Sequence, residues 1–313
     1  MRRTKMDVLI IVIPVLFMLG LGVLCRRIKV LSQAGVGDLK QLVMKIMLPV
    51  AIFQALGSAS YTVDTVVVIA VMLCAILVSF GLGYAIRYLM RPPYRKYIPF
   101  LVSIYEGGMI GYPLYTSLCG AENLSHIALL DVACLLFGFG VYMGLLQQAE
   151  TGQRAKIKEL ALSALKNPTF IATVLGIAAG ATGLLQWLLD SGAGGLYLAV
   201  QNIITVGMSA LILLVVGYDL DFSFGLLLPC LKAIAFRIVV QSALALAVIV
   251  VFNALFGENM LLSLAVIMLM ASPAPFSMQS YLRTEEGSHF VSTFNSLYCI
   301  VTVIVYIIIA CLI

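Results

Sequence analysis

The sequence predicts an all-α polytopic membrane protein with ten transmembrane helices in two inverted five-helix repeats, in which helices 4 and 9 are broken. Three observations give this prediction. The chain of 313 residues is 62% hydrophobic and 11% charged, whereas a soluble domain has about 25% charged residues. Its apolar residues form repeated runs near the roughly 20 residues that span a bilayer. A shift of 160 residues aligns glycines and prolines of its two halves.

The apolar runs form two sets of five. The first set is Asp7–Cys25, Asp38–Ser58, Thr62–Leu89, Tyr97–Cys119 and Ser125–Gln147. The second set is Pro168–Leu189, Leu196–Tyr218, Leu227–Leu255, Asn259–Leu282 and Phe290–Ile313. The chain is thereby divided into a first repeat (1–147), a connector (148–167) and a second, inverted repeat (168–313).

The distribution of basic residues predicts the orientation of the protein in the membrane. The loops after spans 2, 4, 6 and 8 carry no Lys or Arg. The loops after spans 1, 3 and 5 carry Arg26, Arg27, Lys29, Lys40, Arg87, Arg91, Arg95, Lys96, Arg154, Lys156, Lys158 and Lys166. Basic loops of membrane proteins face the cytoplasm, so we expect loop 148–167 to be cytoplasmic and both termini to be extracellular. The net charge of +5 then reflects these loops and does not indicate nucleic-acid binding. The expected location is the cell membrane, with lipid as a partner.

Because each half has an odd number of spans, the two halves enter the membrane from opposite sides. The 160-residue shift pairs Gly20 with Gly180, Gln41 with Gln201, Gly57 with Gly217 and Pro113 with Pro273. Inverted repeats of this kind are typical of secondary transporters, whose site lies near the midplane between the repeats.

Two stretches are poor choices for continuous helices. "EGGMIGYP" (106–113) lies inside span 4, and "ASPAPFS" (271–277) lies inside span 9. Glycine is flexible, and proline lacks an N–H donor and clashes with the preceding turn. Broken backbone at membrane depth is tolerated only where protein or a water-filled cavity surrounds it. We therefore expect the two breaks to meet in the middle of the protein.

The breaks predict a binding site. A half-helix begins with unpaired N–H groups and a partial positive charge, and Pro113 and Pro275 suit its first position. Two such starts would hold a substrate carboxylate; the alternative is that the prolines only kink packed helices. The predicted substrate-binding residues are Gly107, Gly108, Gly111, Tyr112, Pro113, Ser272, Pro273, Pro275, Phe276, Ser277 and Pro49.

Two intramembrane acids are candidate ion-coupling residues, because such groups are functional candidates by default. We expect Glu106 to end the first half of span 4, where low dielectric and a negative helix end favour its protonated form. The alternatives are a permanently protonated hydrogen-bond donor or a pair with Lys45 or Arg237. Asp131 in span 5 would bind a cation, pair with a base or make an interhelical hydrogen bond. Arg237 is expected in the first turns of span 8, near the cytoplasm.

Four stretches, in this order and spacing, resemble the auxin efflux carrier family of membrane transporters. They are "LVMKIMLPVAIF" (42–53), "GMIGYPLY" (108–115), "LKNPTFIATVLGI" (165–177) and "LLVVGYDL" (213–220). The resemblance runs along nearly the whole chain. It implies ten helices in two inverted repeats with crossed broken helices 4 and 9, similar to the fold of bile-acid/sodium symporters. Members carry organic anions such as malate or, in plants, auxin. This chain departs from the family pattern at Glu106, where Asn is usual, and at Ser209, where Pro is frequent.

We expect a secondary active transporter of a small mono- or dicarboxylate that works by alternating access and is coupled to protons. A sodium-coupled symporter and a uniporter of the same fold stay open, as do the direction of transport and a homodimer. A non-transporting sensor or scaffold is the alternative from another class. No enzyme is expected, because the sequence lacks HExxH metal spacing and a GxxxxGK phosphate loop. No cofactor is expected other than H⁺ or Na⁺ as the coupling ion, and no metal site is expected.

Overall fold

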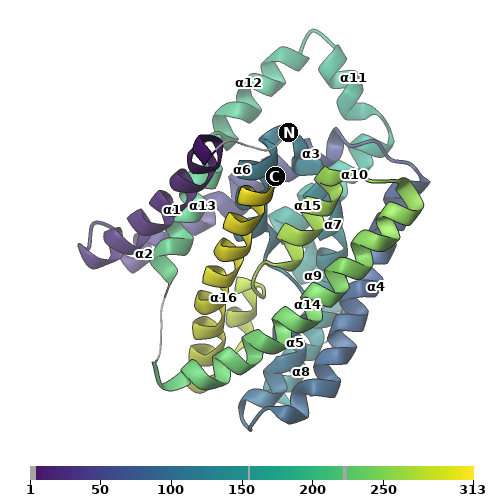
Figure 1. The fold of residues 1–313 in the computed structure, drawn as a ribbon. Coiled ribbons are helices and arrows are strands. Elements are labelled where there is room, and N and C mark those ends of the chain that lie inside the picture. The colour runs from purple at the N-terminus through teal and green to yellow at the C-terminus, as the bar shows by residue number, and fades with distance from the viewer. Residues whose placement is uncertain (1–4, 154–155, 221–223) are drawn as a thin grey trace.

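The computed structural model describes residues 5–153, 156–220 and 224–313, and the regular elements within these ranges are all helical (Figure 1). Seven helices in this part of the chain are long and apolar enough to cross a membrane. An eighth span is added if the helices Lys158–Leu165 and Pro168–Ala181, bent by 76°, count as one. The protein is therefore an all-helical, polytopic membrane protein.

The long helices correspond to predicted spans 1, 2, 3, 5, 7, 8 and 10. The first half consists of α1 (Lys5–Arg27), α2 (Gln33–Leu42), η1 (Val43–Met47), α3 (Leu48–Gly57), α4 (Val63–Ile86), η2 (Arg87–Leu89), η3 (Tyr94–Tyr97), α5 (Ile98–Ser103), η4 (Gly107–Gly111), α6 (Tyr112–Cys119), η5 (Ala121–Asn123), α7 (Leu124–Phe137), η6 (Gly138–Tyr142) and α8 (Met143–Thr151). The second half consists of α9 (Ile157–Leu165), α10 (Pro168–Ala181), α11 (Leu184–Asp190), α12 (Gly194–Thr205), α13 (Met208–Asp219), η7 (Phe224–Leu226), α14 (Leu227–Phe256), α15 (Met260–Met270), η8 (Phe276–Tyr281) and α16 (Glu285–Leu312).

The segment of predicted span 4 is interrupted, but not at its glycines and Pro113. The interruption lies at residues 104–106, between α5 and η4, where Ile104 has extended backbone. Residues 107–119 are helical without a gap, first as the π-helical turn η4 and then as α6. The predicted position of this break was therefore wrong by a few residues.

Two of the three π-helical turns in the described part of the chain lie just before a proline, whereas η6 does not. Pro113 lies just after η4, and Pro49 lies just after a second π-helical turn, η1. Proline removes one helical hydrogen bond and clashes with the carbonyl four residues earlier. Widening the preceding turn to a π-helix relieves this conflict within a continuous helix. In this sequence context a single proline therefore alters a helix without breaking it.

The segment of predicted span 9 is interrupted where its two prolines predicted. α15 ends at Met270, and the 3-10 helix η8 begins at Phe276. Pro273 and Pro275 both lie in the residues between them, where the chain lacks two backbone donors. The double proline thus breaks a helix that one proline only widens.

The helices pack in two groups. In one group, α1 lies along α13 and α10 lies along α3. In the other group, α4, α5, α7, α14, α15 and α16 pack against one another. The groups meet where α3 contacts α7, α13 contacts η4 and α6, and α1 contacts α16. The two interrupted segments therefore lie beside the boundary between the groups.

Glycines allow the close packing within the first group. A Cβ atom on Gly22 of α1 would lie 2.1 Å from the carbonyl oxygen of Leu214, and one on Gly217 of α13 would lie 2.1 Å from that of Leu19. In the second pair, a Cβ atom on Gly180 of α10 would lie 3.1 Å from the carbonyl oxygen of Gly57 in α3. Small residues that let backbones approach are typical of helix packing in membranes.

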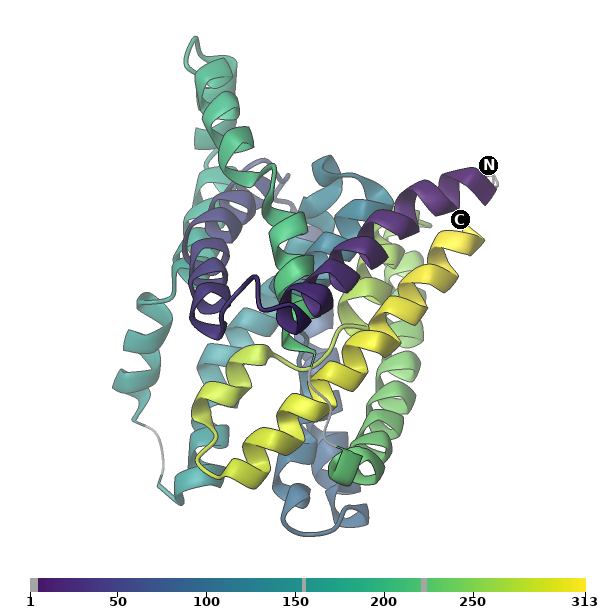
Figure 2. The same cartoon turned by 90° about the vertical axis from the view of Figure 1, so that its left-hand side faces the viewer.

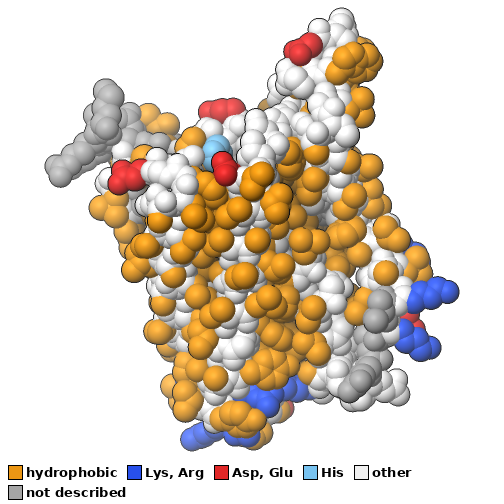
Figure 3. All heavy atoms as spheres, turned by 90° about the vertical axis from the view of Figure 1, so that its right-hand side faces the viewer, with side chains coloured by type: hydrophobic (Ala, Val, Ile, Leu, Met, Phe, Trp, Pro, Cys, Tyr) orange, Lys and Arg blue, Asp and Glu red, His pale blue; other side chains and the backbone are white. Residues whose placement is uncertain are grey.

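The surface fits a bilayer. Large apolar side chains such as Phe17 of α1 and Val239 of α14 are exposed on the outer helix faces. On the face in Figure 3, hydrophobic side chains form a broad band, with Lys and Arg mainly at its lower end and Asp and Glu mainly at its upper end. The start of α1 and the end of α16 lie close together, toward the acidic end, where α11 and α12 project (Figures 1 and 2). The charges thus differ between the two ends of the helix bundle.

Candidate functional site

Arg237 of α14 joins the carbonyl ends of both interrupted segments. Its guanidinium donates hydrogen bonds to the carbonyl oxygens of Leu101 and, at 3.0 Å, Ile104 at the end of α5. It also donates to the carbonyl oxygens of Ser272, at 2.7 Å, and Pro273, at 3.2 Å, beyond the end of α15. The side chain is 0% exposed. The sequence places Arg237 in the first turns of its helix but does not identify these partners; broken helix ends inside the protein require a donor.

Gln241, one turn further along α14, continues this arrangement. Its side-chain amide donates to the carbonyl oxygen of Val102 and, at 3.1 Å, to the hydroxyl of Ser79. Its amide oxygen accepts a hydrogen bond from the hydroxyl of Tyr105 at 2.9 Å. The same helix therefore satisfies the last carbonyl groups of α5 with two side chains.

Glu106 joins the N–H ends of both segments. It is the N-cap of η4, and its Oε1 accepts a hydrogen bond from the backbone N–H of Met109 at 3.2 Å. Its Oε2 accepts a hydrogen bond from the backbone N–H of Phe276 at 2.8 Å, where η8 begins. The carboxylate therefore caps the second half of its segment. The expectation that it faces the carbonyls that end the first half was wrong.

The two interruptions are also bonded directly. The backbone N–H of Glu106 donates to the carbonyl oxygen of Pro273 at 2.9 Å. Glycines permit the approach: a Cβ atom on Gly111 would lie 3.2 Å from the hydroxyl oxygen of Ser272. The predicted meeting of the two broken stretches is therefore present in the structure.

Asp131 of α7 lies next to this meeting point. A Cβ atom on Gly107 would lie 2.6 Å from one carboxylate oxygen of Asp131, and the hydroxyl of Tyr112 donates to that carboxylate at 2.8 Å. Asp131 is 7% exposed. The alternative interpretation of Asp131 as a partner in a hydrogen bond between elements is therefore realised.

The predicted basic partners of Glu106 lie elsewhere. Lys45 is exposed and donates to the side-chain oxygen of Gln41 at 2.7 Å, while Arg237 binds the carbonyl groups described above. Within the described part of the chain, Glu106 forms no ion pair with either residue.

A cavity of about 490 Å³, here called the Glu106 cavity, opens beside the meeting point. Glu106 and Asp131 contribute its two acids, and Lys40 of α2 contributes a base. Seven of the predicted residues line it, namely Glu106, Gly107, Gly108, Asp131, Pro275, Phe276 and Ser277. The structure thus brings both predicted ion-coupling residues to one cavity.

Six predicted residues do not line this cavity. Five are buried within the meeting point, namely Gly111, Tyr112, Pro113, Ser272 and Pro273. Pro49 lies apart from it, in an apolar groove between α3, α10 and α12. The meeting point is therefore filled largely by backbone and packed side chains.

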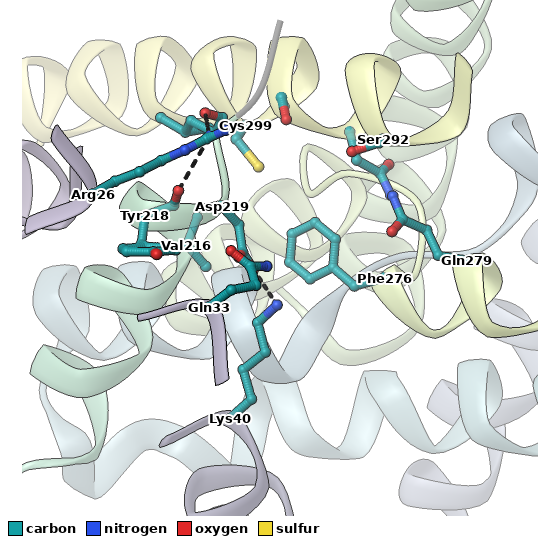
Figure 4. A pocket seen from close by; sticks show the side chains of 13 residues that line it. Arg26, Gln33, Lys40, Val216, Tyr218, Asp219, Phe276, Gln279, Ser292 and Cys299 are labelled. Atoms are coloured by element: carbon teal, nitrogen blue, oxygen red, sulfur yellow. Dashed lines mark hydrogen bonds and ion pairs between the residues drawn. The ribbon is translucent and has the colours of Figure 1, made fainter. Parts of the chain in front are cut away.

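A second cavity, of about 240 Å³, lies on the other side of Phe276 and is here called the Asn295 cavity (Figure 4). Phe276, Gln279 and Lys40 line both cavities. Figure 4 shows the Phe276 ring between Arg26 at one end and Gln279 and Ser292 at the other. The remaining residues that line the Asn295 cavity are Gln33, Val216, Tyr218, Asp219, Leu220, Asn295, Ser296 and Cys299.

Charged residues at the rim of the Asn295 cavity connect α1 and α2 to the end of α13. Lys40 of α2 forms an ion pair with Asp219 at the end of α13. Arg26 donates to the carbonyl oxygen of Leu220 at 2.7 Å. Asp219 was not among the residues predicted to form a site. Its place in the "VVGYDL" stretch, directly after an apolar span, was the only available signal.

No cluster of three His, Cys, Asp or Glu side chains within residues 5–153, 156–220 and 224–313 is placed to hold a metal ion. Comparison of the chain with models of known protein families and with curated proteins finds no match.

Proposed function

We propose that the protein is a secondary active transporter of a small organic anion, such as a mono- or dicarboxylate, that works by alternating access and is coupled to protons at Glu106. The observation that carries this proposal is the double hydrogen bond of the Glu106 carboxylate. It links the two interrupted segments at the wall of a cavity inside an apolar helix bundle. Interrupted helices that meet in this way are typical of the binding sites of secondary transporters. Transport, and not an enzymatic reaction, is the activity that we assign.

The proposed fold has ten spans, namely the seven long helices, the two interrupted segments and α10. The packing of the glycine-rich helices supports two inverted repeats. α1 packs on α13 at Gly217, and α10 packs on α3 at Gly57. The 160-residue shift that relates Gly57 to Gly217 also relates span 1 to span 6 and span 2 to span 7. Each repeat thus contributes its first span to a pair with the second span of the other repeat.

The proposed orientation places the basic end of the bundle in the cytoplasm. Both cavities at Phe276 include Lys40 of α2, which belongs to the basic stretch that follows span 1 in the sequence. A separate cavity of about 410 Å³ is lined by residues such as Gln54, Glu122 and Thr205 and includes none of the meeting-point residues. These observations support a state in which the site is open toward the cytoplasm.

Coupling at Glu106 follows from its hydrogen bonds. The ionised carboxylate offers acceptors to two backbone N–H groups, whereas a protonated carboxyl group has one acceptor replaced by a donor. Loading a proton would therefore weaken the link between η4 and η8, and losing it would restore the link. The nearby acid Asp131 adds a like charge on the same cavity, which favours uptake of a cation. This arrangement also suits Na⁺, so the coupling ion is the first property to test.

The test is flux into proteoliposomes that contain the purified protein. Uptake of malate, succinate or lactate should depend on an imposed proton gradient, and Glu106→Gln should abolish this dependence. Flux driven by a sodium gradient alone would show that Na⁺, and not the proton, is the coupling ion. Flux that follows only the substrate gradient would mark a uniporter, and no flux of any carboxylate would refute the anion transporter.

A further inference from the structure

Asn295 of α16 has an unusual environment. Its side chain is 2% exposed, and neither its Oδ1 nor its Nδ2 atom has a hydrogen-bond partner among the residues that the structure describes. Leaving a buried donor or acceptor unpaired costs about 1–3 kcal/mol. Asn295 also lines the Asn295 cavity. A ligand in that cavity would therefore satisfy a polar group that the fold itself leaves without a partner.

Two of the N–H groups that would hold a substrate carboxylate at the meeting point are already occupied. The backbone N–H groups of Met109 and Phe276 both donate to Glu106. The protein thus supplies its own carboxylate at the place where the sequence predicts one from the substrate. A transported anion requires other donors.

The charges of the two cavities differ. The charged residues that line the Glu106 cavity are the acids Glu106 and Asp131 and the base Lys40. Those that line the Asn295 cavity are the bases Arg26 and Lys40 and the acid Asp219. An anion is therefore repelled by the first set and attracted by the second.

We infer that the carboxylate of the transported anion binds in the Asn295 cavity, with the Asn295 amide as one of its donors, and not between the two half-helix starts. This inference rests on the proposed function. Gln279, Ser292 and Gln33 add amide and hydroxyl groups to the same cavity. The remaining surface includes Phe276 and Val216, which suit the apolar part of a small organic acid.

The position of Phe276 connects this site with Glu106. The backbone N–H of Phe276 donates a hydrogen bond to the carboxylate of Glu106, and Phe276 lines both cavities. Gln279 of the same element also lines both. η8 is thus a shared wall between the coupling acid and the bound anion, so a shift of η8 would change both sites.

The test measures binding of malate, succinate and lactate to the purified protein by calorimetry, together with the melting temperature of the ligand-free protein. Asn295→Leu should weaken binding roughly 10- to 100-fold, the value of one hydrogen bond to a charged group. It should leave the ligand-free melting temperature unchanged or raised, because an unpaired buried amide contributes nothing to stability. Asn295→Asp, which adds a negative charge, should abolish binding. The matched control is Asn202→Leu at an exposed asparagine of α12, which should bind as wild type.

Two results would overturn the inference and leave the proposed function standing. One is wild-type affinity in Asn295→Leu with gradient-driven flux intact. The other is binding in Asn295→Asp that equals or exceeds that of wild type. If no carboxylate binds the wild-type protein and none is transported, the proposed function fails, and the inference fails with it.

Discussion

The carboxylate of Glu106 accepts a hydrogen bond from the backbone N–H of Phe276 at 2.8 Å, although the two residues are 170 positions apart in the sequence. The same carboxylate accepts from Met109 in its own segment. Arg237 makes the complementary contact with the carbonyl groups of both segments. One acid and one base therefore satisfy the broken backbone on its two sides, and the predictions below test this arrangement and the packing around it.

Glu106→Gln should lower the stability of the folded protein by roughly 1–3 kcal/mol, because the new amide nitrogen would face a backbone N–H donor. Glu106→Asp keeps the charge but is too short to reach both donors, so it should also destabilise. The measurement is the melting temperature of the purified protein in detergent at neutral pH. If Glu106→Gln melted with wild-type stability, the ionised carboxylate could not be the acceptor for both groups.

Arg237→Met should destabilise the protein by at least about 3 kcal/mol, because it leaves four carbonyl contacts in a buried site without their donor. Arg237→Lys should lie between this variant and wild type, since one ammonium cannot reproduce the planar guanidinium. Lys232→Met is the matched control on the same helix, because Lys232 is exposed and donates only to the carbonyl oxygen of Leu89 at 2.6 Å. Equal melting temperatures of Arg237→Met and Lys232→Met would contradict this account.

Gly22→Ala should destabilise the contact between α1 and α13 by about 1–3 kcal/mol, since its Cβ atom would lie 2.1 Å from the carbonyl oxygen of Leu214 and backbone cannot yield cheaply. Gly20→Ala lies in the same helix, and its Cβ atom would meet nothing within 4 Å. Gly20→Ala, the control, should therefore leave the free energy of unfolding unchanged or raise it by up to about 1 kcal/mol through helix propensity. Thermal melts of the two variants give the comparison; the reverse order of stability would rule out the close contact.

Lys96→Met should destabilise by roughly 1–3 kcal/mol, because Lys96 pairs at 2.6 Å with Glu150, whose side chain is 0% exposed. Glu150 also accepts from the backbone N–H of Arg283 at 2.9 Å, so the pair ties α8 and η3 to the segment before α16. The exposed pair of Lys156 and Glu159, separated by 4.0 Å, is the control. Lys156→Met should change stability by less than about 1 kcal/mol.

The pair of Lys96 and Glu150 also predicts a pH dependence. Partial burial lowers the pKa of Lys96, but hydrogen bonds to Glu150 and Tyr97 outweigh burial and raise the pKa above the ordinary lysine value of 10.5. A raised lysine pKa stabilises the fold fully at lower pH, and this contribution is lost as the pH rises through the raised pKa. The difference in melting temperature between wild type and Lys96→Met should therefore stay constant through neutral pH and shrink in strong alkali.

The sequence by itself determined the apolar helices, the different charges of the two ends and the neighbourhood of both interruptions. Each of these depends on composition and on local backbone chemistry. The double proline at 273 and 275 broke its helix as predicted, because two donors within three residues are missing whatever surrounds them. The break near Glu106 was predicted a few residues too late, since the single Pro113 is accommodated by a π-helical turn.

Only the tertiary structure decided which groups meet at the interruptions. Arg237 reads locally as a residue near a helix start, yet packing of α14 against α5 brings it to four buried carbonyl contacts. The sequence predicts Glu106 at the end of a half-helix, whereas in the structure its carboxylate caps the beginnings of two helical elements, η4 and η8. Asn295 lacks a partner only because of the side chains that surround α16. The free energy of a polar group depends on the donors and acceptors within hydrogen-bond distance, and those come from segments far away in the sequence.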